Sequence, residues 1–335
     1  MINSEVFRFL RGLVLISIVL VIVLVAKGVR AETSVPSDAK AWLAAARSAM
    51  GELNYRGMIT YLKDSQVESL KVIHGVNDGI EQERLLSVNT PMREIIRNAD
   101  KVTCYFPETR SMMVESKLSR HSYLFDLPSN LTELTKYYGF MLGGTEYVAQ
   151  RPARLITIEP LDEFRYGRKL WLDVESKLPL KYELIDDQGQ VVEQMVFNTL
   201  TVEASIPPED LKPSTRVDDS WKIKQHELLP AESLRWTLNN VPEGFRMMSY
   251  TRLLKRGSDN RAIDHILLSD GFSSVSIYID QLMNEVFTSQ PKKFGAIHSY
   301  TRKMDKYLLT VMGEVPEVAV QTIGNGIRQQ STQHQ

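Results

Sequence analysis

The residues best suited to chemistry are six histidines and one cysteine, and their spacing matches no common catalytic or metal site. The histidines are His74, His121, His226, His265, His298 and His334. Zinc sites on helices need histidines four residues apart, as in H-E-x-x-H, and no two of these have that spacing. The lone Cys104 excludes an intrachain disulfide and a cysteine-based zinc or iron–sulfur site. We therefore expect no metal ion and no cofactor.

The sequence likewise gives no support for nucleophilic or acid–base catalysis. The sequence has no G-x-S-x-G nucleophile elbow and no Walker loop. The acidic pair Asp186-Asp187 is followed by Gln188-Gly189, which is typical of a hairpin turn rather than of a glycosidase pair. An exported hydrolase remains the third hypothesis for this chain, but it would need a nucleophile and a base that the sequence does not offer. We expect a protein that is not an enzyme.

Charge and composition restrict the class further. The chain has 40 Lys and Arg residues against 41 Asp and Glu residues, so no net positive field favours nucleic acid. Hydrophobic residues make up 43% and charged residues 24%, as in ordinary globular domains. Basic residues at 292–293 and 302–306 are either a modest basic patch or solvated loop charges. A length of 335 residues favours two domains.

The N-terminal segment has the layout of a secretory signal peptide. Two arginines precede an apolar run at 13–26, which contains one polar residue. Small or apolar side chains at Val29 and Ala31 suit cleavage after Ala31. A helix over this run would be about 21 Å long, short of a hydrocarbon core of about 30 Å, although a retained signal anchor is the alternative. We expect a soluble periplasmic protein that begins at Glu32.

After a first helix, the pattern becomes that of an antiparallel sheet. Ser37 is a candidate N-cap for a helix in which Leu43, Ala46 and Met50 recur at spacings of three and four. Alternation then predicts strands at 55–63, 67–75, 80–88, 94–97, 101–106, 111–115, 146–158, 165–174, 178–184 and 190–202. Cys104 falls in one of them and is expected to be a small buried hydrophobe. Tight turns between consecutive strands indicate an antiparallel meander.

One apolar stretch is set apart by its spacing. Leu127, Leu131, Leu134, Tyr138 and Leu142 recur every three or four residues and predict a helix that Gly143-Gly144 ends. These side chains are either core or the lining of a pocket for an apolar ligand under a curved sheet. The candidate ligand-binding residues are Phe125, Leu127, Leu131, Leu134, Tyr138, Leu142 and Trp171.

A second domain follows a proline-rich stretch with little periodicity. Strands are expected at 244–255, 263–268, 273–281, 295–303 and 307–313, with Ser269-Asp270-Gly271 as a hairpin turn. Val320, Ile323 and Ile327 mark a short closing helix. The predicted organisation is a signal peptide (1–31), a large domain (32–206), a linker (207–232), a small domain (233–328) and a disordered tail (329–335).

Short segments in both domains, in a fixed order, carry a family resemblance. In the large domain they are LNYRG (53–57), ERL (83–85), RE (93–94), YGRKLWLD (166–173) and LPL (178–180). In the small domain they are VPEGF (241–245), LSDG (268–271) and TVMGEVP (310–316). Together they resemble the periplasmic sigma-E regulatory proteins, the RseB/MucB family, along nearly all of the mature chain.

The resemblance implies both a fold and a role. The fold is α+β: a large open half-barrel antiparallel sheet packed on helices, similar to lipoprotein carriers, plus a smaller antiparallel sheet domain with a helix. The role is a non-enzymatic negative regulator that binds the periplasmic region of a membrane-spanning anti-sigma factor and shields it from proteolysis. Lipid A or an acylated lipoprotein would release it, and a homodimer would be expected. A lipid or lipoprotein carrier without a signalling partner is the alternative.

The partner is expected to bind the small domain and its junction with the large one. The reason is that a carrier needs only the half-barrel, so the added domain should supply the added function. A partner segment could add a strand to a sheet edge or lie in the groove between the domains. Polar residues in or beside the strands of the small domain are the candidate contacts: Arg246, Arg252, His265, Arg302 and Lys306.

Overall fold

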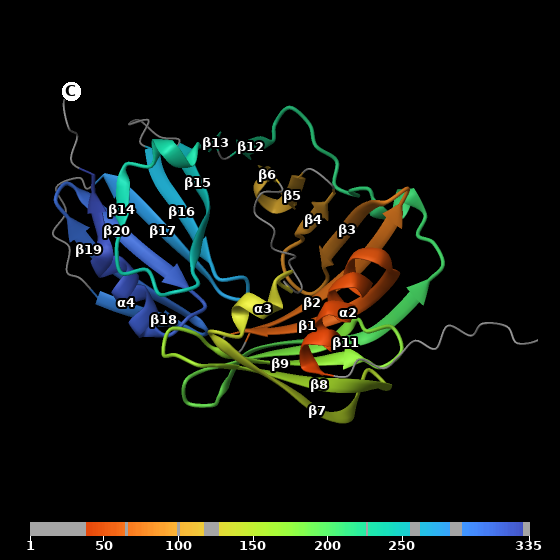
Figure 1. Cartoon of the computed structure of the whole chain (residues 1–335). Coiled ribbons are helices and arrows are strands. Elements are labelled where there is room, and N and C mark those ends of the chain that lie inside the picture. Colours follow the sequence, from red (N-terminus) through yellow and green to blue (C-terminus); the bar gives the residue numbers. More distant parts are fainter. Residues whose placement is uncertain are drawn as a thin grey trace, which may run out of the picture. The chain divides into compact units, whose positions relative to one another are not determined.

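The structure is a computed structural model that describes residues 38–63, 66–98, 101–116, 127–225, 227–254, 262–281 and 290–330. The predicted signal peptide, Phe125 and most of the predicted tail lie outside these residues. Within the described ranges, no helix has both the length and the apolar character needed to cross a bilayer. The fold consists mostly of strands, in one large and one smaller sheet (Figure 1).

The large sheet has twelve strands in the order β12-β6-β5-β4-β3-β2-β1-β11-β10-β9-β8-β7. Its neighbours are antiparallel, except that β12 pairs with β6 in parallel. The bounds are β1 (Asn54–Lys63), β2 (Gln66–Asn77), β3 (Ile80–Ser87), β4 (Glu94–Arg97), β5 (Lys101–Phe106), β6 (Ser111–Ser116), β7 (Tyr138–Val148), β8 (Arg151–Pro160), β9 (Gly167–Asp173), β10 (Pro179–Ile185), β11 (Val191–Glu203) and β12 (Lys222–Gln225). The open antiparallel sheet expected for the large domain is confirmed.

Helix α2 (Ala39–Glu52) lies against one face of this sheet (Figure 1). Its N-cap is Asp38 rather than the predicted Ser37, and the Asp38 carboxylate accepts a hydrogen bond from the Ala41 amide at 2.8 Å. Trp42 and Leu43 on its inner side are buried among side chains of β8 and β9, including Ile156 and Leu170. The helix therefore covers the β7–β9 end of the sheet and supplies a third of the buried residues of that core.

The helix predicted over 127–142 is wrong for most of its length. Only α3 (Leu131–Leu134), a single turn, is helical, and β7 begins at Tyr138. The three-to-four spacing arises because Leu127, Leu131, Leu134 and Tyr138 all face the core beneath α2 from an irregular segment. The predicted cap, Gly143-Gly144, is instead a bulge where β7 shifts register against β8.

The single strand predicted at 146–158 is also wrong, because the chain turns inside it. Ala149 and Gln150 connect β7 to β8 and both have positive φ, at 52° and 61°. A two-residue turn of this kind is ordinarily recognised by Asn-Gly or Asp-Gly. Neither residue gives that signal here.

The connection between the two sheets is more structured than predicted. After β11, Ile206 and Leu211 pack on Ile73 of β2, with Leu211 ending the short helix η2 (Pro208–Leu211). The chain then adds β12 to the large sheet and β13 (Glu227–Leu228) to the small one, before η3 (Ala231–Ser233). Only position 226 separates those two strands, so the connection ties both sheets by backbone hydrogen bonds.

The small sheet has seven antiparallel strands in the order β13-β15-β16-β17-β20-β19-β18. They are β13, β15 (Arg246–Leu254), β16 (Ala262–Ser269), β17 (Ser274–Gln281), β18 (Gln290–Phe294), β19 (Ile297–Met304) and β20 (Tyr307–Gly313). Helix α4 (Glu317–Gly326) packs on β19 and β20, and its buried Val320 and Ile323 close a core around Ile277 and Val311. The small antiparallel sheet with a helix is confirmed.

The C-terminal strand also pairs with another strand. Strand β21 (Ile327–Gln329) joins β14 (Trp236–Leu238) in a two-stranded ladder, in which Gln329 faces Trp236. The first residue of the predicted disordered tail is therefore in a strand. A third short helix, η1 (Pro107–Thr109), connects β5 to β6.

Candidate functional site

A cleft of about 680 Å³ opens between the α2-covered face of the large sheet and the start of β15. Its floor comes from the C-terminal turn of α2 and from strands β1, β3, β4 and β5, and its rim comes from the 127–137 segment and the small sheet. The lining mixes apolar and charged groups. Principal residues are Arg47, Met50, Tyr55, Glu81, Glu83, Arg97, Val102, Leu127, Leu134, Arg246 and Met248.

A row of polar side chains crosses the floor of this cleft. Tyr55, His74, Glu83 and Arg97 are successive cross-strand partners on β1, β2, β3 and β4, so the sheet register brings them to one face. Tyr55 stacks on His74 with ring centroids 4.7 Å apart. Glu81, two residues before Glu83, joins the row through His74 Nε2 at 3.1 Å and through Arg97. We call these five residues the polar row.

Glu81 and Arg97 of the polar row form an ion pair, and His74 contacts the same Glu81 carboxylate. His74 Nδ1 lies 2.8 Å from the Leu53 carbonyl and Nε2 lies 3.1 Å from a Glu81 carboxylate oxygen. Both neighbours are hydrogen-bond acceptors, so each ring nitrogen of His74 faces an oxygen. Burial opposes ionisation of Glu81, but hydrogen bonds from His74 and Arg97 outweigh it and lower the pKa of Glu81 to about 2. The floor therefore combines fixed charges of both signs in a partly dry site.

The rim of the cleft is exposed and joins the two sheets. Arg246 at the start of β15 reaches Glu133 of α3, with Nη2 3.4 Å from Oε2. Met248 on the same strand is 43% exposed. Opposite them, Arg47 donates to the Leu127 carbonyl at 2.9 Å and holds the 127–137 segment against α2. The rim thus offers charged and apolar groups to anything that enters.

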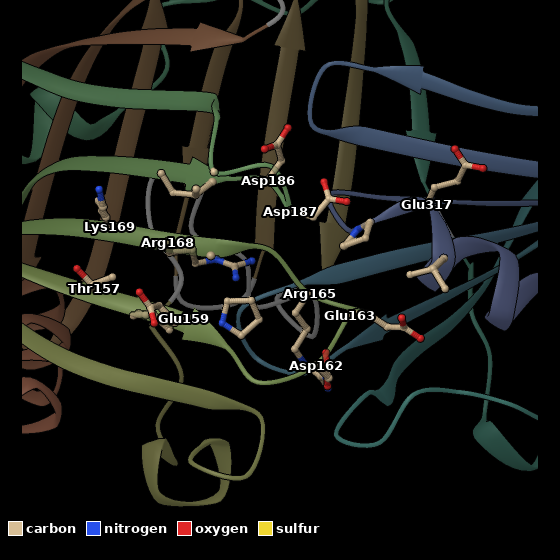
Figure 2. A pocket seen from close by; sticks show the side chains of 17 residues that line it. Thr157, Glu159, Asp162, Glu163, Arg165, Arg168, Lys169, Asp186, Asp187 and Glu317 are labelled. Carbon is tan, nitrogen blue, oxygen red and sulfur yellow. The ribbon is translucent and has the colours of Figure 1, made fainter.

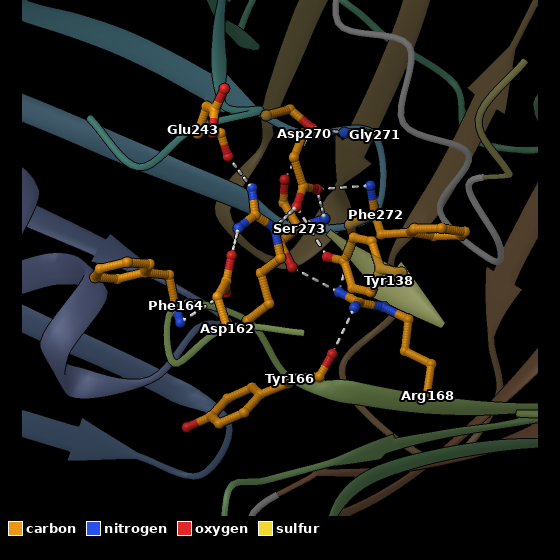
Figure 3. A network of polar contacts seen from close by, with 12 residues as sticks. Tyr138, Asp162, Phe164, Tyr166, Arg168, Glu243, Asp270, Gly271, Phe272 and Ser273 are labelled. Carbon is orange, nitrogen blue, oxygen red and sulfur yellow. Dashed lines mark hydrogen bonds and ion pairs between the residues drawn. The ribbon is translucent and has the colours of Figure 1, made fainter. Parts of the chain in front are cut away.

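Beside the cleft, a buried ionic network fastens the large sheet to the small sheet (Figure 3). Arg165 Nε lies 2.6 Å from Asp270 Oδ2, which also accepts from Tyr138 Oη at 2.8 Å. Arg165 further donates to Asp162 and to the Glu243 carbonyl. Arg168 donates to the Phe272 carbonyl at 2.9 Å and to Ser273 Oγ at 2.8 Å. Such a network fixes the two sheets in one arrangement.

A second cleft, of about 600 Å³, lies on another side of this network (Figure 2). It is lined by six carboxylates and three cations: Glu159, Asp162, Glu163, Asp186, Asp187, Glu317, Arg165, Arg168 and Lys169. Several are already engaged, since Asp186 accepts backbone hydrogen bonds and both arginines belong to the network. Across the described residues, no group of three or more His, Cys, Asp or Glu side chains is placed to hold a metal ion.

The predicted ligand-binding residues are only partly brought together. Leu127 and Leu134 border the 680 Å³ cleft, whereas Leu131 and Tyr138 are packed in the core beneath α2. Leu142 is 40% exposed on β7. Trp171 lies on the opposite face of the sheet from Leu170 and Leu172, where its indole donates to Glu146 at 2.8 Å. Phe125 is outside the described residues.

The predicted partner-binding residues divide by environment. Arg246 lines the cleft and Lys306 is exposed beside the Tyr307 ring. Arg252 pairs with Asp264 at 3.3 Å, and His265 stacks on Tyr278. Arg302 donates to the carbonyls of Gly324 and Ile327, both at 2.8 Å, at the end of α4. The structure brings Arg246 alone of these five to the cleft.

Sequence reasoning missed the polar row and the buried network. His74 gave a weak signal as a histidine inside a strand pattern, and Asp270 was assigned only to a turn. Arg165 stood at the start of a predicted strand with nothing to show that it is wholly buried. Glu83 stands in the polar run Glu81-Gln82-Glu83-Arg84 and Arg165 closely follows Asp162-Glu163, so no apolar pattern marked either residue as buried.

Both parts of the chain match known families. Residues 38–215 match the MucB/RseB N-terminal domain and residues 230–328 match the MucB/RseB C-terminal domain. The chain is 27% identical to the sigma-E factor regulatory protein RseB of Escherichia coli (strain K12) over 288 residues, covering 82% of this chain and 86% of that protein. It is 25% identical to the sigma factor AlgU regulatory protein MucB of Pseudomonas aeruginosa over 299 residues, covering 87% and 91%.

Solved structures share the fold. MucB in the complex structure of Pseudomonas aeruginosa MucA/MucB superposes with a TM-score of 0.71 at 22% identity, covering 88% of this chain and 99% of that one. The crystal structure of MucB in complex with MucA(peri) gives a TM-score of 0.69 at 23% identity, covering 88% and 100%. Because the two family matches span well over half of the chain, this protein belongs to the MucB/RseB family.

Proposed function

We propose that this protein is a non-enzymatic periplasmic regulator of a sigma-E-type stress response that binds the periplasmic region of an anti-sigma factor in the 680 Å³ cleft. The observation that carries the proposal is that both sheets build this cleft, since Arg246 and Met248 of the small sheet line it together with Glu83 and other residues of the large sheet. Relatives in the family are named regulators, and solved MucB structures contain MucA. The proposal extends that partner class to this chain.

The lining of the cleft favours a peptide occupant. Apolar groups from Met50, Val102 and Leu134 share the lining with charged and polar groups, which suits a peptide with mixed side chains. A segment held there would be enclosed between two sheets that the Arg165–Asp270 network keeps together. Enclosure of that kind would shield the segment from a protease, which is the negative regulation proposed here.

An acylated ligand that releases the partner is part of the same proposal. Leu127 and Leu134 border both the cleft and the core beneath α2. An acyl chain entering between them would compete with the partner for the floor. Each buried CH₂ of the chain would contribute about 0.8 kcal/mol, so potency should rise with chain length.

Binding of the anti-sigma factor's periplasmic region from the same organism to the full chain tests the proposal. Met248→Glu places a charge in the cleft and should weaken binding at least about tenfold. Met92→Glu is the matched control, because Met92 is 41% exposed and lies outside the cleft. Equal affinity of the two variants, or no binding by the unaltered chain, would overturn the proposal. Truncating the chain before the small sheet is a poor test, because it would uncover Arg165.

A further inference from the structure

One oxygen on the floor of the cleft is buried without a partner. Glu83 is 3% exposed, and its Oε2 accepts from Arg97 Nε at 3.0 Å. Its Oε1 is inaccessible and has no hydrogen-bond partner in the structure. Buried carboxylate oxygens are almost always hydrogen-bonded, because an unpaired one loses its water without compensation. Glu83 borders the cleft, so a rotation of its side chain that exposes Oε1 would let a molecule in the cleft supply the missing donor.

The charges around Glu83 restrict what kind of donor fits. Arg97 pairs with both Glu83 and Glu81, so Glu83 already has a cationic partner. A second cation such as an ammonium group would have to give up its hydration shell in a partly dry site, which is costly. A neutral N–H donor satisfies Oε1 without that cost.

We propose that Glu83 Oε1 accepts a hydrogen bond from a backbone amide N–H of the peptide that occupies the cleft. The inference rests on the proposed function and adds a residue that fixes the peptide's register. A backbone amide is neutral and recurs at every residue except proline, whatever the side chains. The mixture of apolar and polar groups in the lining favours a peptide over a simple acyl chain as the source of this amide.

Glu83→Gln inverts the chemistry of this position while keeping its shape. Arg97 Nε can only donate, so the amide oxygen of the new glutamine must take the place of Oε2. The glutamine NH₂ then takes the place of Oε1. The acceptor for the peptide becomes a donor, and an N–H at that point of the peptide is repelled.

An ester scan of the bound peptide tests the assignment. The probes are synthetic peptides covering the periplasmic region of the anti-sigma factor, each with one backbone amide replaced by an ester, which removes one N–H donor. Against the unaltered full chain, one ester position should weaken binding at least about tenfold, the value of a hydrogen bond to a charged group. Against Glu83→Gln, the same ester should bind as well as the amide or better, because the ester oxygen can accept.

Glu68→Gln is the matched control, since it removes one charge from a Glu–Arg pair outside the cleft, where Glu68 accepts from Arg93 at 2.7 Å. It should keep the full sensitivity to the ester. If Glu83→Gln does not fold, Glu83→Asp withdraws the carboxylate by one methylene and should also reduce the sensitivity.

The outcomes separate this inference from the proposed function. The peptides could bind, with Met248→Glu weakening their binding, while no ester position depends on Glu83. The cleft would then be the binding site, and the Glu83 assignment would be wrong. If no peptide binds, or if binding is indifferent to Met248→Glu, the proposed function itself fails. Equal loss at one ester position in both the unaltered chain and Glu83→Gln would assign that amide to another acceptor and overturn the inference.

Discussion

Arg165 and Asp270, which are 105 residues apart in sequence, form an ion pair in which neither side chain reaches solvent. Arg165 comes from the loop before β9 and Asp270 from the hairpin between β16 and β17, so the pair joins the two sheets. Tyr137 and Phe245 stack against the guanidinium, with its carbon 4.7 Å and 4.8 Å from their ring centroids. A pair of this kind specifies one arrangement more than it stabilises.

Removing one charge of this pair should therefore strongly destabilise the folded protein. Asp270→Asn leaves Arg165 buried with Asp162 as its remaining carboxylate, and we expect a loss of about 3 kcal/mol in the free energy of unfolding. Urea denaturation followed by tryptophan fluorescence measures it. Glu133→Gln breaks the exposed pair with Arg246, and its cost should stay below about 1 kcal/mol. Similar losses in the two variants would show that the Arg165–Asp270 pair has no special role.

Gly244 lies at the same junction between the two sheets, and neighbouring side chains pack closely against it. This packing gives a second prediction. Gly244 has φ of +92°, and a Cβ there would lie 2.7 Å from Tyr137 and 2.8 Å from Arg165 Nη2. Gly244→Ala should lose about 2–4 kcal/mol, from left-handed strain plus a clash in a packed site. Gly189→Ala, at φ of +77° with nothing within 4 Å, isolates the strain and should cost about 1–2 kcal/mol. The prediction is wrong if thermal melts show equal losses for both.

Arg302 was predicted as a partner contact, and its surroundings suggest a test of that role. It donates to the carbonyl of Gly324 near the end of α4, where helices leave backbone acceptors without intrahelical partners, and to the carbonyl of Ile327 just after it. Arg302→Met should lower the free energy of unfolding by about 1.5–3 kcal/mol. Lys306→Met, on an exposed turn nearby, should leave stability within about 0.5 kcal/mol. An unchanged stability for Arg302→Met, together with weaker partner binding, would support the predicted role as a partner contact.

Local signals in the sequence account for what was predicted well. Strand β9 and the turn at Ser269-Asp270-Gly271 follow from alternation and from turn residues, both of which act over a few neighbours. Cys104 is buried in a strand, as expected. The family resemblance extended this to the open large sheet and the separate small one.

The candidate site could not be predicted because it depends on register. Tyr55, His74, Glu83 and Arg97 are separated by nine to nineteen positions and meet only through cross-strand pairing. The helix expected over 127–142 failed for a related reason: an irregular segment that faces one core can imitate helical spacing. Tertiary packing therefore determines both the polar row and the conformation of the 127–142 segment.

A second contact between the sheets contains two carboxylates and one lysine. Lys63 Nζ on β1 lies 2.6 Å from Glu314, which follows β20, and 3.4 Å from Glu193 on β11. Burial and the nearby Glu314 charge raise the pKa of Glu193 to about 7, although Lys63 and Tyr61 act in the opposite direction. Glu193 is therefore a group whose ionisation falls within the physiological range.

This contact predicts a stability that falls as pH rises. A carboxyl with a folded pKa of about 7 and an unfolded pKa near 4.5 holds its proton more tightly when folded, so its contribution is fully present below pH 4.5 and is lost as pH rises towards 7. The loss is up to about 3 kcal/mol. Glu81, with its pKa of about 2, titrates below this window. Urea unfolding at pH 5 and pH 8 should show a decline in the unaltered chain that Glu193→Gln largely removes. An equal decline in both proteins would assign the pH dependence to other groups.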